Sequence, residues 1–99
     1  MCGMITKWIQ FSVTPDSSAA FRTELASVEA ASKQEHGCAH YSAYQSHDDC
    51  QVFTVLESWE TEAAFEAHRK APHVADFKVK CEAMIVEKSA LSLDELAAG

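Results

Sequence analysis

The chain has 99 residues, of which 47% are hydrophobic, and a net charge of -7 at pH 7. This length suits one domain of marginal stability, which the burial of further surface in a dimer would stabilise. The acidic balance and the 8 scattered Lys and Arg residues argue against binding to nucleic acid or to anionic membranes. No run approaches the ~20 apolar residues of a membrane span. The N-terminus also lacks the pattern of a signal peptide, so we expect a cytoplasmic protein.

The four cysteines lack the C-x-x-C spacing of metal or redox motifs and lie in unrelated local contexts. In a cytoplasmic chain they are expected to be reduced, with Cys38 and Cys81 serving as small core residues. Cys2 could be exposed and oxidisable, but that carries no functional message.

Residues 4–13 alternate in hydrophobicity and predict a first strand, in which Lys7 and Trp8 each lie on the unexpected face. Such exceptions are typical of a sheet buried on both sides, of a pocket wall, or of a Trp in a dimer interface. Thr14-Pro15-Asp16 predicts a helix start, and the apolar stripe after it indicates a core-facing helix. Gly37 is expected to end this helix in the left-handed conformation.

Residues 38–46 and 53–59 predict a hairpin of two strands joined by a polar turn at 47–50. If Ser46 pairs with Gln51, five side chains lie on one face of the sheet: His40, Tyr44, Phe53, Glu57 and Trp59. A slip of one residue would remove this grouping, because each side chain would then move to the other face.

The pattern changes to a helix after Trp59, with Thr61 as its cap and Glu62 in its first turn. Ala64, Phe65 and His68 share one face of this helix. Pro72 ends it and begins a second helix, whose first turn contains His73 and whose apolar side contains Val74, Phe77 and Cys81. Residues 83–89 predict the last strand, and residues 90–99 a weakly amphipathic C-terminal arm.

The resulting order is β-α-β-β-α-α-β, without repeats or linkers. It predicts an α+β, ferredoxin-like split βαβ fold with an antiparallel sheet and helices on one face. We expect one domain over residues 1–99, with a core at about 4–88 and the arm at 89–99. The other face of the sheet then needs cover, for which a second copy of the chain is the simplest source.

Two motifs support a family resemblance. The run E-x-W-x-x-x-x-A-x-x-x-H-x-x-x-P-H, from Glu57 to His73, resembles the antibiotic biosynthesis monooxygenase family, including its quinol monooxygenase members. Glu35-His36-Gly37-Cys38 followed by Tyr41 is similar to that family's E-P-G-C-x-x-Y. The resemblance implies a dimeric α+β barrel. It leaves the reaction open, because the family's members oxidise, isomerise, degrade haem or have no established chemistry.

The chain also departs from the family pattern. His36 replaces a common proline, which affects the turn, and Ala71 replaces a common serine, which removes a helix cap. Some actinorhodin-type members have Asn and Trp where Ala64 and His68 align, so their proton relay does not transfer. The haem-degrading branch uses an Asn, a Trp and a His ligand where this chain has Ile9, His68 and Lys78.

Several kinds of chemistry lack the residues they need. His68 and His73 are five residues apart, about 140° around an ideal helix, so they do not form the i, i+4 pair of a helical zinc motif. The turn at residues 47–50 offers metal-binding side chains, but an ordinary polar turn accounts for them. No nucleophile elbow, phosphate loop or dinucleotide fingerprint is present. Cys38 with His36 or His40 could form a thiolate pair, although a buried small residue explains Cys38 equally. We therefore expect neither metal nor cofactor.

General acid–base chemistry remains, with His68 as the candidate base for a phenol or hydroquinone. A histidine on an amphipathic helix is also often a half-exposed or satisfied structural residue. His73 is a second catalytic candidate that could instead have a positional role. Glu57 could orient an imidazole, particularly that of His40, or form a surface pair. The side chains that suit a flat aromatic substrate are Trp59, Phe53, Phe65, Phe77 and Tyr44, although Phe53 and Phe77 also fit the core.

The sequence thus predicts a homodimeric, cofactor-independent monooxygenase that oxidises a quinol or polyphenol with dioxygen. An isomerase or tautomerase of a small carbonyl compound would use the same base without oxygen. A non-catalytic dimer that binds an aromatic metabolite or haem under stress is the alternative outside enzymology.

Overall fold

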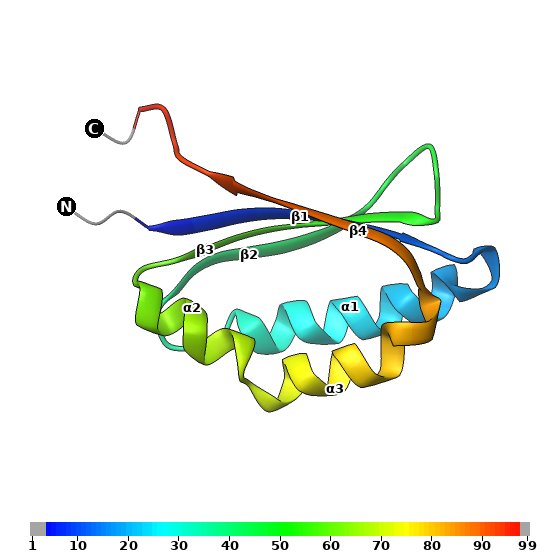
Figure 1. Cartoon of the computed structure of the whole chain (residues 1–99), viewed down its shortest axis with the longest axis horizontal. Coiled ribbons are helices and arrows are strands. Elements are labelled where there is room, and N and C mark those ends of the chain that lie inside the picture. The colour runs from blue at the N-terminus through cyan, green and yellow to red at the C-terminus, as the bar shows by residue number, and fades with distance from the viewer. Residues whose placement is uncertain (1–3, 98–99) are drawn as a thin grey trace.

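The computed structural model describes residues 4–97 and consists of a four-stranded antiparallel sheet with three helices packed on one face (Figure 1). The strands are β1 (Ile5–Val13), β2 (Cys38–Gln45), β3 (Val52–Trp59) and β4 (Ile85–Leu93). Their order in the sheet is β2-β3-β1-β4. The helices are α1 (Ser18–Ser32), α2 (Glu62–Arg69) and α3 (Pro72–Cys81), with 3-10 turns at Pro15–Ser17 and Glu82–Met84. This arrangement confirms the predicted α+β fold class and element order.

Aromatic side chains dominate the core between the sheet and α1. Phe21 of α1 is fully buried and contacts Phe11 of β1 and Phe53 of β3, with ring centroids 5.3 and 4.9 Å apart. Burying a phenylalanine side chain stabilises a fold by roughly 1.5–3 kcal/mol. The alternation predicted for β1 and β3 is confirmed, since the odd-numbered residues of both strands carry the buried side chains.

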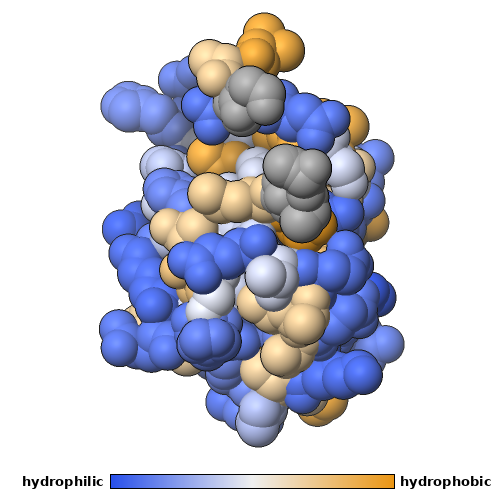
Figure 2. All heavy atoms as spheres, turned by 90° about the vertical axis from the view of Figure 1, so that its left-hand side faces the viewer, coloured by the Kyte–Doolittle hydropathy of each residue, from blue (hydrophilic) through white to orange (hydrophobic). Residues whose placement is uncertain are grey.

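No helix within residues 4–97 lies over the other face of the sheet (Figure 1). Trp8, Leu91 and Leu93 lie there, with 38%, 60% and 37% of their surfaces exposed, and Leu91 pairs with Trp8 in the ladder. Figure 2 looks onto the end of the molecule beside α2 and shows hydrophobic atoms reaching the surface at the top, on the sheet side, above largely hydrophilic flanks. The prediction that Trp8 lies opposite the core face is confirmed.

Two predicted boundaries were wrong. β4 runs to Leu93, so residues 90–93 extend the strand instead of starting an amphipathic arm, because their backbone pairs with the edge of β1. Gly37 has the predicted positive φ of 83°, but α1 already ends at Ser32. Residues 33–37 form a turn, and the Gly37 carbonyl accepts a hydrogen bond of 2.8 Å from the Glu60 amide. None of the helices within residues 4–97 is long and apolar enough to cross a membrane.

Candidate active site

His68 lies on the side of α2 that faces the sheet. The hydroxyl of Thr61 accepts a hydrogen bond of 3.0 Å from the Ala64 amide, which confirms the predicted cap and fixes where the helix begins. Ala64 and His68, four residues apart, are the two buried residues of α2. The His68 imidazole lies against the fully buried indole of Trp59, with ring centroids 4.5 Å apart. The predicted change from strand to helix after Trp59 therefore brings an indole and an imidazole together.

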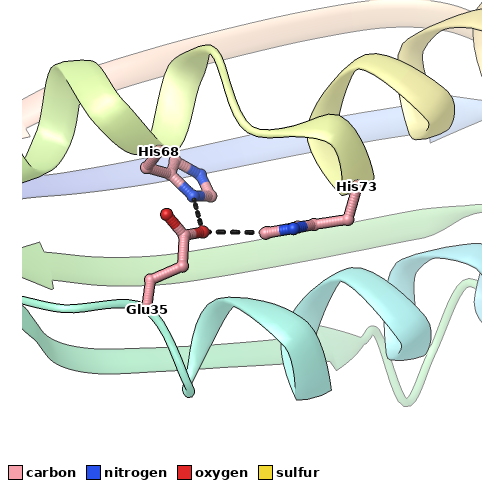
Figure 3. A group of neighbouring side chains, drawn as sticks. All are labelled: Glu35, His68 and His73. Atoms are coloured by element: carbon pink, nitrogen blue, oxygen red, sulfur yellow. Dashed lines mark hydrogen bonds and ion pairs between the residues drawn. The ribbon is translucent and has the colours of Figure 1, made fainter.

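A single carboxylate oxygen holds both histidines (Figure 3). Glu35 Oε2 lies 2.7 Å from His68 Nδ1 and 2.8 Å from His73 Nε2. Glu35 comes from the turn after α1, and His73 from the first turn of α3. The buried Ser32 hydroxyl lies 3.3 Å from the same nitrogen of His73. Three segments that are distant in the sequence thus meet at one acceptor.

The contact with Glu35 determines which nitrogen of His68 can act as a base. An ionised carboxylate only accepts hydrogen bonds, so Nδ1 must carry the proton that it donates to Glu35. In the neutral imidazole the lone pair then lies on Nε2. That nitrogen is 3.6 Å from Oε1 of Glu57. The arrangement resembles the carboxylate–imidazole pairs that orient a catalytic histidine in other enzymes.

Glu57 is a buried carboxyl group with one strong donor. It is 2% exposed, and its Oε1 accepts a hydrogen bond of 2.7 Å from the indole nitrogen of Trp59. Burial raises the pKa of Glu57, while the Trp59 hydrogen bond and the nearby charge of His68 oppose that rise. Glu57 therefore holds a proton more readily than an exposed glutamate, beside the free nitrogen of His68.

A pocket of about 630 Å³ opens between the sheet and helices α2 and α3. Glu57 and His68 line it, together with the buried Tyr41, whose ring centroid is 5.7 Å from that of His68. Burial and the charge of Glu57 raise the pKa of Tyr41 above its usual range, so its hydroxyl stays protonated. Most of the remaining wall is apolar or aromatic: Ile9, Phe11, Leu25, Val28, Val55, Phe65, Val74, Phe77, Val79 and Ile85. Such a cavity, with a few convergent polar groups, is typical of a small-molecule site.

The predicted site residues on the helix face divide into three groups. His68, Glu57, Phe65 and Phe77 line the pocket. Trp59 and His73 lie immediately behind it, in contact with His68 or with Glu35. Phe53 does not line this pocket; it belongs to the buried core and packs against Phe21, with ring centroids 4.9 Å apart.

His40 and Tyr44 were predicted on the wrong face, because the hairpin register differs by one residue. Tyr41 pairs with Glu57, and Gln45 with Phe53, whereas the prediction paired His40 and Tyr44 with them. The loop is one residue longer than expected, since the Ser46 amide donates to the Val52 carbonyl at 2.8 Å. His40 and Tyr44 are consequently exposed on the bare face, and Glu57 approaches His68, not His40.

Sequence reasoning missed Glu35 and Tyr41 as site residues. Both belong to the run Glu35-His36-Gly37-Cys38 followed by Tyr41, which served above only as evidence of the family. A signal was therefore present. It could not be assigned to the site, because nothing local in the sequence shows that this turn packs against α2 and α3.

Glu35, His68 and His73 could also hold a divalent metal ion, because one ligand atom from each lies within 4.8 Å of the others. The two histidines are not an i, i+4 pair on one helix, as the sequence analysis noted. They come together because the break at Ala71-Pro72 places them on separate helices. Hydrogen bonding to Glu35 and metal binding would use the same atoms, so the two arrangements exclude one another.

Comparisons with known proteins agree with this fold and with the motifs. Residues 4–80 match the model of the family described as "Antibiotic biosynthesis monooxygenase". "Putative monooxygenase YcnE" of Bacillus subtilis is 30% identical over 77 residues, which cover 78% of this chain and 81% of that protein. "Putative monooxygenase Rv0793" of Mycobacterium tuberculosis is 26% identical over 93 residues, covering 90% of this chain and 91% of its own length.

A solved structure shows the same likeness in three dimensions. The crystal structure of PA3566 from Pseudomonas aeruginosa superposes with a TM-score of 0.92 at 29% identity, covering 98% of each chain. The family model spans most of the chain, and it includes the turn with Glu35 and the helices with His68 and His73. The chain belongs to the antibiotic biosynthesis monooxygenase family.

Proposed function

We propose that this protein is a cofactor-independent monooxygenase that oxidises a quinol or related polyphenol with dioxygen, with His68 as the base. The observation that carries the proposal is the hydrogen bond from His68 Nδ1 to Glu35, which leaves Nε2 as the acceptor in an aromatic-lined pocket. Family membership supports monooxygenase chemistry, and the pocket supports a flat aromatic substrate.

The first step is proton transfer from a phenolic hydroxyl to Nε2 of His68. Glu35 stabilises the imidazolium that forms, because its carboxylate accepts the Nδ1–H bond. The apolar walls exclude water around the phenolate, so that the electron-rich ring remains poorly solvated. Burial of the site thus favours electron transfer from the substrate to oxygen.

Oxidation then needs no electrons beyond those of the substrate. The phenolate gives one electron to dioxygen, and the two radicals combine to form a carbon–oxygen bond. The resulting peroxide takes the proton held by His68, and loss of the ring proton expels the outer oxygen as water. One oxygen atom enters the ring as a carbonyl, and the substrate loses two hydrogens.

We also propose that the bare face of the sheet pairs with a second copy of the chain. Trp8, Leu91 and Leu93 together expose an apolar surface on a strand pair that no helix of the described part of the chain covers. Monomeric proteins rarely leave contiguous apolar patches of this kind in water. Self-association would bury both copies of the patch without altering the pocket, which lies on the other face.

One contact favours a second candidate, an isomerase or tautomerase. Glu57 Oε1 lies 3.6 Å from Nε2 of His68, and its raised pKa suits a group that exchanges protons. Such a pair could remove a proton from one atom of a carbonyl compound and return it to another. This reaction would proceed without oxygen.

Oxygen uptake by chelator-treated, flavin-free protein on a panel of hydroquinones and dihydroxynaphthalenes tests the proposal. We expect uptake above autoxidation, with one quinone formed per dioxygen consumed, and its loss in His68→Asn. Turnover that continues without oxygen would replace the proposal with the isomerase. Saturable binding without any turnover would replace it with a binding protein for aromatic metabolites.

A further inference from the structure

The pocket has a charge distribution that differs from that of the whole chain. The chain contains 15 acidic residues and 8 Lys and Arg residues. The pocket wall nevertheless contains three of the basic residues, Arg69, Lys78 and Lys88, and only two of the acidic ones, Glu57 and Glu82. Basic residues are therefore concentrated at this site in an otherwise acidic protein.

The three cations differ in how far other side chains neutralise them. Arg69 forms an ion pair with Glu66, with Nη1 and Oε2 3.3 Å apart. Lys78 and Lys88 have no acidic partner within ion-pair distance among residues 4–97. These two lysines line the pocket from different elements, Lys78 from α3 and Lys88 from β4. They are the positive charges of the pocket wall that no acidic side chain within residues 4–97 pairs with.

Lys88 lies on an unusual face for a charged residue. It pairs with Phe11 across the β1–β4 ladder, which places its side chain on the same side of the sheet as the helices. Its Nζ is 5.7 Å from the centroid of the Phe11 ring, and both residues line the pocket. A lysine above an aromatic wall can contact the ring of a ligand and its negative group together.

From this placement we infer that the pocket takes an aromatic substrate bearing an anionic group, such as a carboxylate, that binds between Lys78 and Lys88. The inference rests on the proposed function only in assuming that the same pocket receives the aromatic ring. With the anion at the two lysines, the ring occupies the apolar wall and its hydroxyl is directed toward His68. The negative group would thus orient the substrate and favour one class of polyphenol, the phenolic acids.

Equilibrium binding tests this inference without turnover. The probes are a hydroxynaphthoic acid and its methyl ester, which have the same ring system and differ in charge. Their binding is measured by anaerobic calorimetric titration. Exposed charge pairs change affinity modestly. We accordingly expect the acid to bind about tenfold more tightly than the ester, and added salt to remove this advantage.

The variants Lys78→Gln and Lys88→Gln should each weaken binding of the acid by about threefold and leave binding of the ester unchanged. Lys80→Gln is the matched control, because Lys80 is also on α3 but pairs with Glu24 and Asp76 and does not line the pocket. Equal affinity for acid and ester, binding of neither, or an acid preference that survives in the double lysine variant would overturn the inference. Failure of oxygen uptake alone would remove the monooxygenase proposal and leave this result standing.

Discussion

The two faces of one sheet differ in what covers them. On the helix face, α1 packs a cluster of phenylalanine rings over the strands, and α2 and α3 supply the buried His68 and walls of a pocket. On the other face, Trp8 and Leu91 pair across two strands without any cover from residues 4–97. The same alternating strands therefore line the candidate site on one side and carry the exposed apolar patch, our proposed association surface, on the other.

The largest expected effect is on catalysis at the helix face. His68→Asn should lower kcat/KM for the quinol by about 10²–10⁴-fold, because a positioned general base contributes on that order. The matched control is His40→Asn, which removes an imidazole from the opposite face of the same sheet. Oxygen-electrode assays of both variants check the prediction, and an equal loss in His40→Asn would contradict the division between the faces.

The next effect is on stability. Phe21→Ala should lower the free energy of unfolding by about 3–5 kcal/mol, because it leaves a cavity among packed rings. Val79→Ala, which removes a 78% exposed side chain on α3, should change it by no more than about 0.5 kcal/mol. Urea denaturation should give the same loss for Phe21→Ala at low and high protein concentration. If the loss in free energy of unfolding instead changed with protein concentration, the stability of this core would depend on a partner.

Changes on the bare face should instead affect self-association, which depends on protein concentration. Trp8→Glu places a charge in the proposed interface and should weaken self-association by about 30-fold or more, since buried Trp residues are common hot spots. Gln10→Glu adds the same charge two residues along the same strand face, at an exposed polar position, and should have a smaller effect. Light scattering after size-exclusion chromatography measures both variants. A wild-type chain that remains monomeric at high concentration would contradict the proposed pairing.

The smallest effect tests how the helix face is held in place. Thr61→Ala removes the acceptor for the Ala64 amide and should cost about 1 kcal/mol in thermal unfolding. Thr23→Ala is the control, because its hydroxyl donates to the Ala19 carbonyl within α1 and caps no helix end. Equal destabilisation by the two variants would show that the cap has no special role.

Local patterns predicted the elements well, because caps and hydrophobic alternation act over a few residues. The Thr61 cap and the new helix at Pro72 both formed where the sequence placed them. The prediction of the hairpin register failed because the register depends on one additional residue in a polar loop, which moved His40 and Tyr44 to the bare face.

The candidate site could be predicted only in part. His68, Glu57 and Trp59 lie near one another in the sequence, so their meeting followed from a strand-to-helix corner. Glu35 is 33 residues from His68, and its role depends on how α1, α2 and α3 pack. Tertiary packing of that kind leaves no periodic signal in a single sequence.

Gly37 limits which sequences can form this packing. It lies two residues after Glu35, and a side-chain carbon at this position would come within 2.5 Å of the Ala64 Cβ on the helix that carries His68. Its positive φ disfavours other residues as well. In a library randomised at position 37, we expect only glycine to retain the contact between Glu35 and His68. The absence of a side chain at one turn thus restricts how this protein can diverge while it keeps His68 in place.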